Sequence, residues 1–277
     1  MSLFEKEINN IFKKINLKKG DIIFLVSDIT KLIIYFKKRK IYFDINLFLN
    51  TLIKTIGKTG TLALPTYNWD FCEGKDFNYY KTKSMTGSLG SVALKRKDFV
   101  RTRHPIYSFA ITGSETKKIL KLKHKSCFGE DSPFAFFYKK NAKYLSIGVD
   151  YKSLGFTPVH YVEEKVGVNY RYFKKFHGNF VDKKGKKKKI ECKFFVKDLS
   201  KISMTGIREE TDKKLLGINA ISKHFICDNN FMVIKLKPAI NLLIKNLKDK
   251  SIKKKLIFPL KNNNIKRSKI NELNAYQ

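Results

Sequence analysis

The chain has 277 residues, and its Lys and Arg outnumber its Asp and Glu by 58 to 24, which gives a formal net charge of +34. Hydrophobic residues make up 43% and aromatic residues 13%, a composition that excludes an intrinsically disordered protein. The longest apolar runs are too short to span a bilayer, and residues 1–10 lack the apolar core of a signal peptide. We therefore expect a globular protein that does not insert into membranes.

The positive charge is spread along the whole chain rather than gathered into one basic segment. Its densest run, residues 183–189, lies between two strand-like segments and is explained by a solvated turn. The sequence therefore does not favour nucleic acid as the main partner. The net charge instead favours an anionic small molecule, attracted by a positive surface field.

The four cysteines are scattered, and no pair has the spacing of a zinc ligand pair or a disulfide framework. They are Cys72, Cys127, Cys192 and Cys227. We therefore expect a reduced, cytoplasmic protein without a metal site.

The N-terminal third alternates helix and strand patterns. Residues 4–15 predict a helix, and residues 21–26 predict a buried strand. Ser27, Asp28 and Thr30 follow at the carboxyl end of that strand, where open α/β sheets place ligand sites. They would serve equally well as caps of the next helix.

A second strand–helix unit leads into an aromatic loop. Residues 43–56 predict a helix and residues 61–65 another buried strand, and two such units in a row indicate an α/β sheet. Tyr67, Trp69 and Asp70 then follow. The two aromatic rings could stack on a sugar or a nucleobase, and packing in the core or the loop is an equally open alternative.

Two further segments suit a phosphorylated ligand. Ser88 lies in a stretch rich in glycine and hydroxyl groups that precedes a helix, and such a stretch can hold phosphate. Arg101, Arg103 and His104 crowd before a predicted strand at residues 109–112, where they could bind an anionic group. A solvated basic turn is the alternative for that block.

A candidate base follows a predicted strand at residues 144–149. Thr157 is a plausible N-cap, and Pro158 fits the first helical turn. His160 and Glu163 are three residues apart and so share one helical face. A carboxylate beside an imidazole raises its pKa and fixes its tautomer, which suits a general base, although an ordinary helix with a satisfied histidine would have the same pattern.

The order and spacing of these motifs resemble the aminoglycoside 3-N-acetyltransferase family. That family carries a strand with a Ser-rich turn, a Pro-Thr strand end, Gly-x-Leu, Arg-Ser-x-His-Pro-x-x-Ser, Ser-Pro and Thr-x-x-His-x-x-Glu. Here they correspond to residues 26–30, 61–66, 87–89, 101–108, 132–133 and 157–163. The chain departs from the family at Val26-Ser27-Asp28, where His-Ser-Ser is usual, and at Thr102, which replaces Ser.

The resemblance implies acetyl-CoA as donor, a sugar amine as acceptor and no metal. It implies His160 as general base, with Glu163 and Asp70 as catalytic carboxylates. It implies coenzyme contacts from Ser27, Asp28, Thr30, Ser88, Arg101, Arg103, His104 and Ser108. It implies acceptor contacts from Tyr67, Trp69, Thr157 and Glu164.

The net charge bears on the acceptor. A chain at +34 repels polycationic aminoglycosides unless its cleft is locally acidic, and it attracts a nucleotide-linked amino sugar. The sequence therefore favours N-acetylation of a nucleotide-linked amino deoxy sugar for surface glycan biosynthesis. Aminoglycoside acetylation, which confers antibiotic resistance, is the alternative, and a non-catalytic binder of an anionic ligand or nucleic acid is the second alternative.

The expected fold is α/β, with a central mixed sheet flanked by helices and an additional antiparallel hairpin or small sheet. We expect a single acetyltransferase domain over residues 1–277, with a β-hairpin insertion at 171–196 and a basic C-terminal tail at 245–277. The protein is expected to be a monomer or a dimer.

Overall fold

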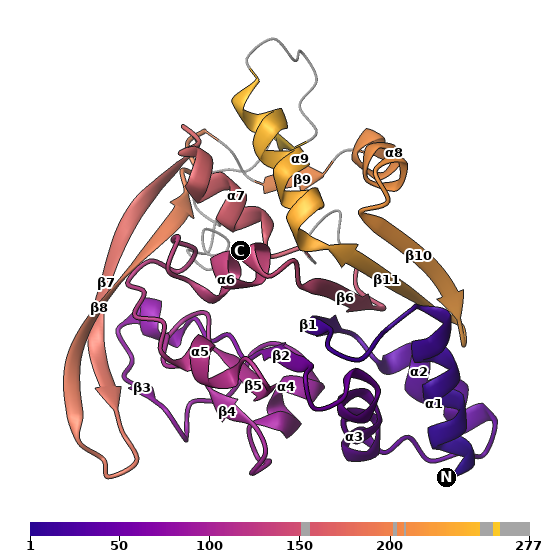
Figure 1. The fold of residues 1–277 in the computed structure, drawn as a ribbon. Helices are drawn as coiled ribbons and strands as arrows, with labels where there is room; N and C mark the ends of the chain where they lie inside the picture. Colours follow the sequence, from indigo (N-terminus) through magenta and orange to yellow (C-terminus); the bar gives the residue numbers. More distant parts are fainter. Residues whose placement is uncertain (151–155, 202–203, 208, 250–256, 261–277) are drawn as a thin grey trace.

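A mixed seven-stranded sheet forms the centre of the protein, in the strand order β10-β11-β6-β1-β2-β5-β4 (Figure 1). The computed structural model describes residues 1–150, 156–201, 204–207, 209–249 and 257–260. The strands are β1 (Ile22–Ser27), β2 (Thr61–Pro65), β4 (Val100–Arg101), β5 (Phe109–Gly113), β6 (Lys143–Ile147), β10 (Ile221–Ile226) and β11 (Asn229–Lys235). β1 runs parallel to β2 and β6, and the other pairs are antiparallel. The predicted mixed α/β sheet is confirmed.

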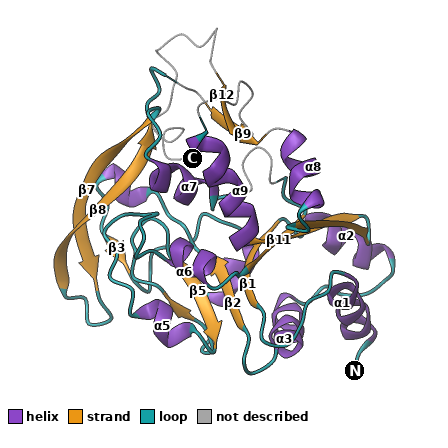
Figure 2. Ribbon diagram, turned by 45° about the horizontal axis from the view of Figure 1, so that its top comes forward, coloured by secondary structure: helices purple, strands orange, loops and turns teal. Residues whose placement is uncertain are grey.

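Helices cover both faces of this sheet because its central strands are apolar on both faces. Ile23 and Leu25 of β1 face one cluster of buried side chains, whereas Phe24 faces the other. The first cluster includes residues of α1 (Leu3–Lys14), α2 (Thr30–Lys38), α3 (Ile45–Ile56) and α4 (Ser88–Ala93). The second includes residues of α5 (Thr116–Leu120), α6 (Pro133–Lys139), α7 (Val159–Val166) and α9 (Leu236–Lys248). Figure 2 shows α1 and α3 at one side of the sheet and α6, α7 and α9 at the other.

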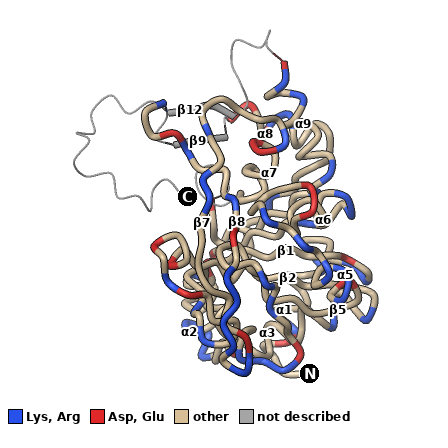
Figure 3. The backbone as a smooth tube through the Cα atoms, turned by 90° about the vertical axis from the view of Figure 1, so that its left-hand side faces the viewer, with Lys and Arg blue, Asp and Glu red and all other residues tan. Residues whose placement is uncertain are grey.

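A second, smaller sheet contains the antiparallel hairpin expected near residues 171–196. β7 (Arg171–Val181) and β8 (Lys187–Lys197) pair along their full length, and β3 (Phe77–Asn78) adds to β7. The turn between them is shorter than the lysine run, so its last lysines, 187–189, stand exposed on β8. Figure 3 shows Lys and Arg repeated along this hairpin.

The helix that carries the candidate base begins later than predicted. α7 starts at Val159, after a turn in which the His160 backbone N–H donates to the Thr157 carbonyl. No side chain caps it, so the expected N-cap role of Thr157 is wrong. The physical reason is that Pro158 itself stands at the cap position, with a helical backbone conformation.

The remaining elements lie toward the C-terminus, apart from a short 3-10 helix, η1 (Asp70–Glu73). They are β9 (Met204–Ile207), which pairs with β12 (Ile257–Leu260), and α8 (Glu209–Gly217). Of the predicted basic tail, residues 250–256 and 261–277 lie outside the described part of the chain. A single-domain organisation stays a prediction. Among the described residues, no helix has both the length and the apolar character needed to cross a bilayer.

Candidate active site

The predicted His–Glu pair is formed on α7. His160 Nδ1 lies 2.9 Å from Glu163 Oε2, and both side chains are buried. One turn of helix separates them, so the helix itself sets this contact. Within the described residues, the other imidazole nitrogen, Nε2, makes no hydrogen bond to the protein. If Nδ1 donates its proton to Glu163, Nε2 keeps a lone pair that can accept a proton.

A third residue, Arg171, completes this cluster from the first position of β7. Its Nε lies 2.8 Å from Glu163 Oε2, and its Nη2 lies 3.1 Å from His160 Nδ1. Arg171 was not among the predicted site residues. The one signal for it in the sequence is the aromatic-basic stretch at residues 170–173, which follows the His–Glu block after six residues, and the contact itself exists only because the start of β7 lies next to His160 and Glu163.

The environment lowers the pKa of His160 below its usual range, which corrects the expectation that its carboxylate partner would raise it. Burial is the largest cause, because it disfavours the charged imidazolium, and Arg171 lowers the pKa further. Glu163 acts in the opposite direction but is outweighed. The imidazole is therefore neutral at pH 7, the state that a base requires.

Aromatic rings lead from the predicted acceptor residues to His160. Tyr67 is buried with its ring centroid 4.6 Å from that of Tyr107, and Trp69 lies 6.2 Å from the same ring. Tyr107 packs 4.7 Å from Phe128, which in turn lies 5.2 Å from the His160 ring. Tyr67 thus belongs to the core beneath the site, whereas Trp69 is half-buried.

Glu164 occupies a carboxylate pocket next to the base. Its Oε1 accepts a hydrogen bond of 2.6 Å from Ser126 Oγ, while its Oε2 is buried without a hydrogen-bond partner among the described residues. Burial, with a smaller contribution from the neighbouring carboxylates Asp131 and Glu130, raises the pKa of Glu164 to about 7, although the hydrogen bonds from Ser126 and the Phe128 backbone act in the opposite direction.

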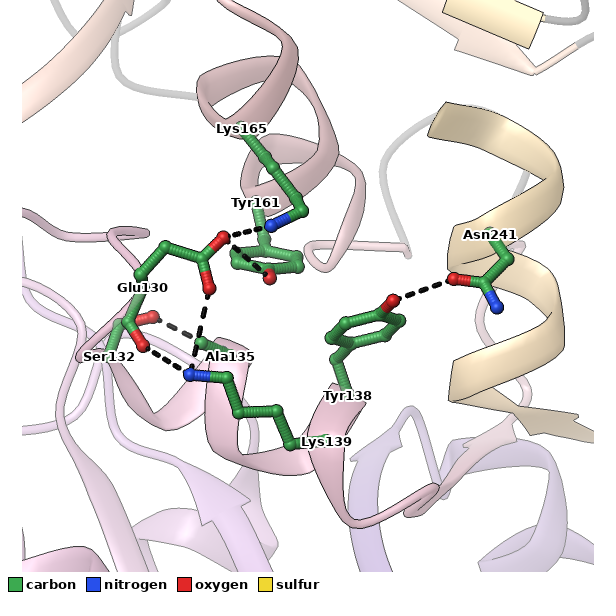
Figure 4. Close-up of polar contacts among 8 residues, drawn as sticks. All are labelled: Glu130, Ser132, Ala135, Tyr138, Lys139, Tyr161, Lys165 and Asn241. Carbon is green, nitrogen blue, oxygen red and sulfur yellow. Dashed lines mark hydrogen bonds and ion pairs between the residues drawn. The ribbon is translucent and has the colours of Figure 1, made fainter. Parts of the chain in front are cut away.

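The adjacent Glu130 is held by cations, as Figure 4 shows. It accepts a hydrogen bond of 3.1 Å from the Tyr161 hydroxyl, contacts Lys165, and pairs with Lys139 at 3.6 Å. These contacts tie the loop before α6 to α7. They also pair Glu130 with cations, which leaves Asp131 and a Glu164 that is about half ionised at pH 7 as the acidic groups on this side of α7.

Replacing Glu164 with Gln should change how stability depends on pH. A carboxyl group whose pKa is higher in the folded state favours folding below its unfolded pKa, near 4.5, and this advantage is lost as the pH rises through about 7. The wild type should therefore lose about 3 kcal/mol of unfolding free energy relative to Glu164→Gln between pH 4.5 and pH 8. Urea unfolding of both proteins across that range tests this, and parallel curves would contradict it.

Four predicted coenzyme residues meet at one edge of the central sheet. Ser27 ends β1, and Asp28 Oδ1 accepts a hydrogen bond of 2.9 Å from the Thr30 backbone N–H at the start of α2. Ser88 begins α4 after Gly87, where a side chain would come within 3.4 Å of the Ser27 carbonyl oxygen. Asp28, Thr30 and Ser88 are exposed, so this edge is accessible.

The residues of the Arg101–Ser108 block lie in two different environments: Arg101 and Ser108 bond to neighbouring loops, whereas Arg103 and His104 line a cavity. The Arg101 guanidinium is buried and donates to Ser108 Oγ and the Thr66 carbonyl at 3.0 Å, and to the Thr82 carbonyl at 2.5 Å. These bonds join segments distant in sequence, so Arg101 and Ser108 organise the loops around the strand ends. Their predicted contact with the coenzyme stays a prediction.

Arg103 and His104 instead line a cavity of about 280 Å³. His104 Nδ1 accepts from the backbone N–H groups of Ile106 and Tyr107, so its Nε2 carries the proton. That N–H is buried and has no acceptor among the described residues. The His104 ring stacks on the His124 ring, and the two ring centroids are 4.8 Å apart. The cavity therefore presents the exposed Arg103 to a ligand oxygen, and the neutral His104, whose N–H is buried, belongs to its wall.

Asp70 lies in η1 and accepts a hydrogen bond of 3.0 Å from Lys75 Nζ. In the described part of the chain, no hydrogen bond or ion pair joins it to His160 or Glu163, so its predicted catalytic role remains a prediction. The same part of the chain holds no group of three or more His, Cys, Asp or Glu side chains placed to bind a metal ion.

Comparisons with known proteins identify the family and the fold. The profile of the aminoglycoside 3-N-acetyltransferase family matches residues 40–248. Three similar solved structures are AAC-IIIb in a binary complex with CoASH (15% identity, TM-score 0.71), AAC-VIa bound to sisomicin (15%, 0.70) and YokD from Bacillus subtilis (20%, 0.66). The alignments cover 88%, 88% and 87% of this chain and 96%, 97% and 97% of those chains, in the same order. A direct sequence search finds no match among curated proteins.

The family profile spans most of the chain, from residue 40 to residue 248. It includes β2, the Arg101–Ser108 block and the whole of α7. The similarity in fold extends over nearly the entire length of the solved structures. The protein therefore belongs to the aminoglycoside 3-N-acetyltransferase family and is an acetyl-CoA-dependent N-acetyltransferase.

Proposed function

We propose that this enzyme acetylates an amine of an aminoglycoside-type amino sugar, with His160 as the general base. The observation that carries the proposal is the buried His160–Glu163 pair, in which Nδ1 is engaged and Nε2 is left without a protein partner in the described residues. Glu163 would fix the tautomer with the proton on Nδ1.

His160 would accept the proton that the amine loses as its nitrogen bonds to the acetyl carbonyl carbon. Glu163 would stabilise the imidazolium that forms. His160 would then give that proton to the coenzyme sulfur as the carbon–sulfur bond breaks, which releases the thiol and restores the neutral imidazole. The backbone N–H groups of Asp28 and Thr30 already donate to the Ile147 carbonyl and to Asp28 Oδ1, so they are not available to the carbonyl oxygen as it gains negative charge. No covalent acyl-enzyme is needed.

The coenzyme would bind at the accessible edge formed by Ser27, Asp28, Thr30 and Ser88. Arg103 and His104 would contribute from their cavity, where an unpartnered buried N–H and an exposed guanidinium suit the oxygens of an anionic ligand. A cytoplasmic location, and a monomer or dimer, stay predictions.

The acceptor assignment rests on local charge rather than net charge. Asp131 lies in the loop before α6, close to Glu164 on α7, which is about half ionised at pH 7, and Glu130 is paired with two lysines. This gives the local acidity that a polycationic acceptor requires, in spite of the overall charge of +34. The family name and the sisomicin complex of AAC-VIa point to the same class. Trp69, Thr157 and Glu164 are the proposed acceptor contacts, with Tyr67 supporting them from the core.

A nucleotide-linked amino sugar, used in surface glycan biosynthesis, is the second candidate. The observation in its favour is the basic rim of the His104 cavity, where Arg103, Lys123 and Lys188 are all exposed. A diphosphate would be attracted to that rim.

Release of thiol from acetyl-CoA, measured with a panel of amines, tests the proposal. The panel holds several aminoglycosides and several nucleotide-linked 3-amino and 4-amino deoxy sugars. We expect turnover with aminoglycosides, and turnover restricted to the nucleotide sugars would establish the second candidate instead. Binding of acetyl-CoA without turnover on either group would contradict both acceptor assignments.

A further inference from the structure

The buried cluster around His160 contains two cationic side chains, Arg171 and Lys197, in addition to the His160–Glu163 pair. Glu163 is fully buried, and so is the guanidinium of Arg171, whose side chain is 1% exposed. Lys197, on β8, is 5% exposed and belongs to the same cluster. The Tyr170 hydroxyl lies beside the Glu163 carboxylate, and the Phe128 ring covers the imidazole.

The three nitrogens of Arg171 each face a defined group. Nε lies 2.8 Å from Glu163 Oε2, Nη2 lies 3.1 Å from His160 Nδ1, and Nη1 donates at 3.0 Å to the Phe195 carbonyl. Glu163 Oε2 therefore contacts both the imidazole and the guanidinium, and the guanidinium also reaches Nδ1 directly. Because Nη2 can only donate, it can hydrogen-bond Nδ1 only while that nitrogen carries no proton, whereas Glu163 accepts from a protonated Nδ1. The charge-assisted bond to the carboxylate is the stronger of the two and favours the proton on Nδ1. The Arg171 guanidinium and the His160 imidazole both contact Glu163 Oε2, so they compete for this one oxygen.

Charge balance decides which protonation state of His160 this arrangement favours. A Glu163–His160 pair alone would stabilise the imidazolium, and an imidazolium cannot accept a proton. Arg171 already neutralises Glu163, so a proton on His160 would leave an extra positive charge in a buried site. Lys197 adds to this penalty, and the low pKa of His160 has Arg171 as its second cause after burial.

We propose that Arg171 is a positioning residue that keeps His160 neutral in the resting enzyme, while Glu163 orients the imidazole through Nδ1. The catalytic consequence rests on the proposed function, because it assumes that His160 is the base. The effect on the imidazole itself does not, because it is a property of the free protein. The two can therefore be tested separately.

The first test is NMR of the free protein with ¹³C- and ¹⁵N-labelled histidine. The chain has five histidines, and the His160 signals are assigned as those lost in His160→Gln. In the wild type we expect His160 to titrate below pH 6.5 and, when neutral, to carry its proton on Nδ1. A wild-type midpoint above 6.5, or a neutral form protonated on Nε2, would overturn the proposal without any variant of Arg171.

The second test compares Arg171→Met with Arg171→Lys. The methionine removes the charge, and we expect the His160 midpoint to rise by roughly one pH unit or more. The lysine keeps a positive charge at the same place and should hold the midpoint near the wild-type value. Arg39→Met, at an exposed arginine paired with Glu7, is the control that should leave it unchanged. Equal midpoints in the wild type and Arg171→Met would refute the role of the charge.

Activity supplies the catalytic readout. The acidic limb of kcat/KM against pH should move upward in Arg171→Met and stay in place in Arg171→Lys. A purely structural role would lower kcat/KM without moving that limb. If the NMR shifts occur and the limb does not move, His160 is not the base, and the proposed mechanism fails while the positioning effect stands.

Discussion

Replacing His160 with Ala should lower turnover about a hundredfold or more at neutral pH, because the acceptor amine then loses the group that takes its proton. Folding should persist, since Arg171 and Glu163 remain paired in the variant. The deficit should narrow at alkaline pH, where the amine is already deprotonated in solution. Thiol release at saturating amine, followed from pH 6 to pH 10, measures both effects.

The matched control is His177→Ala. His177 lies on β7 with 66% of its side chain exposed and pairs with Glu191, so its loss should leave turnover unchanged. Thermal unfolding of both variants separates a loss of catalysis from a loss of structure. A fully active, folded His160→Ala at neutral pH would remove His160 from the mechanism.

Replacing Phe24 with Ala should cost about 3–5 kcal/mol of unfolding free energy. Phe24 is fully buried on the central strand β1, and its ring lies 5.1–6.0 Å from those of Phe109, Phe134, Phe137 and Tyr144. These rings come from β5, α6 and β6, so the cavity left by the substitution has walls fixed by several elements and closes poorly. Urea unfolding, followed by circular dichroism, measures the loss.

Phe225→Ala is the control for this prediction, because the Phe225 side chain on β10 is 73% exposed. The same chemical change there should alter stability by no more than about 0.5 kcal/mol. A loss below about 1 kcal/mol in Phe24→Ala would show that the ring cluster repacks around the missing side chain.

Sequence reasoning succeeded where the signal is local. The strands β1 and β2 and the helix α3 followed from short apolar runs and helical periodicity, with errors of two residues or fewer at their ends. The His160–Glu163 contact followed from the pitch of a helix, which places residues three apart on one face. The family resemblance, carried by motifs in a fixed order, agrees with the profile match.

It failed at one helix cap and left the acceptor open. Thr157 does not cap α7, because its neighbour Pro158 takes that position. The net charge suggested an acceptor class, which stays a prediction, because the acidic groups that bear on it, Asp131 and Glu164, come together only through the loop before α6. Their meeting cannot be read from one segment alone.

The sequence by itself determined the family, the mixed α/β fold and the identity of the candidate base, because these depend on periodicity and on motif order. Only the tertiary structure decided the protonation state of that base. The expected rise in the pKa of His160 considered Glu163 alone, whereas folding buries the imidazole and brings Arg171 within 3.1 Å of it. That contact depends on the long pairing of β7 with β8, which places the first residue of β7 beside α7, and electrostatic energies depend on such distances in space rather than on separation along the chain.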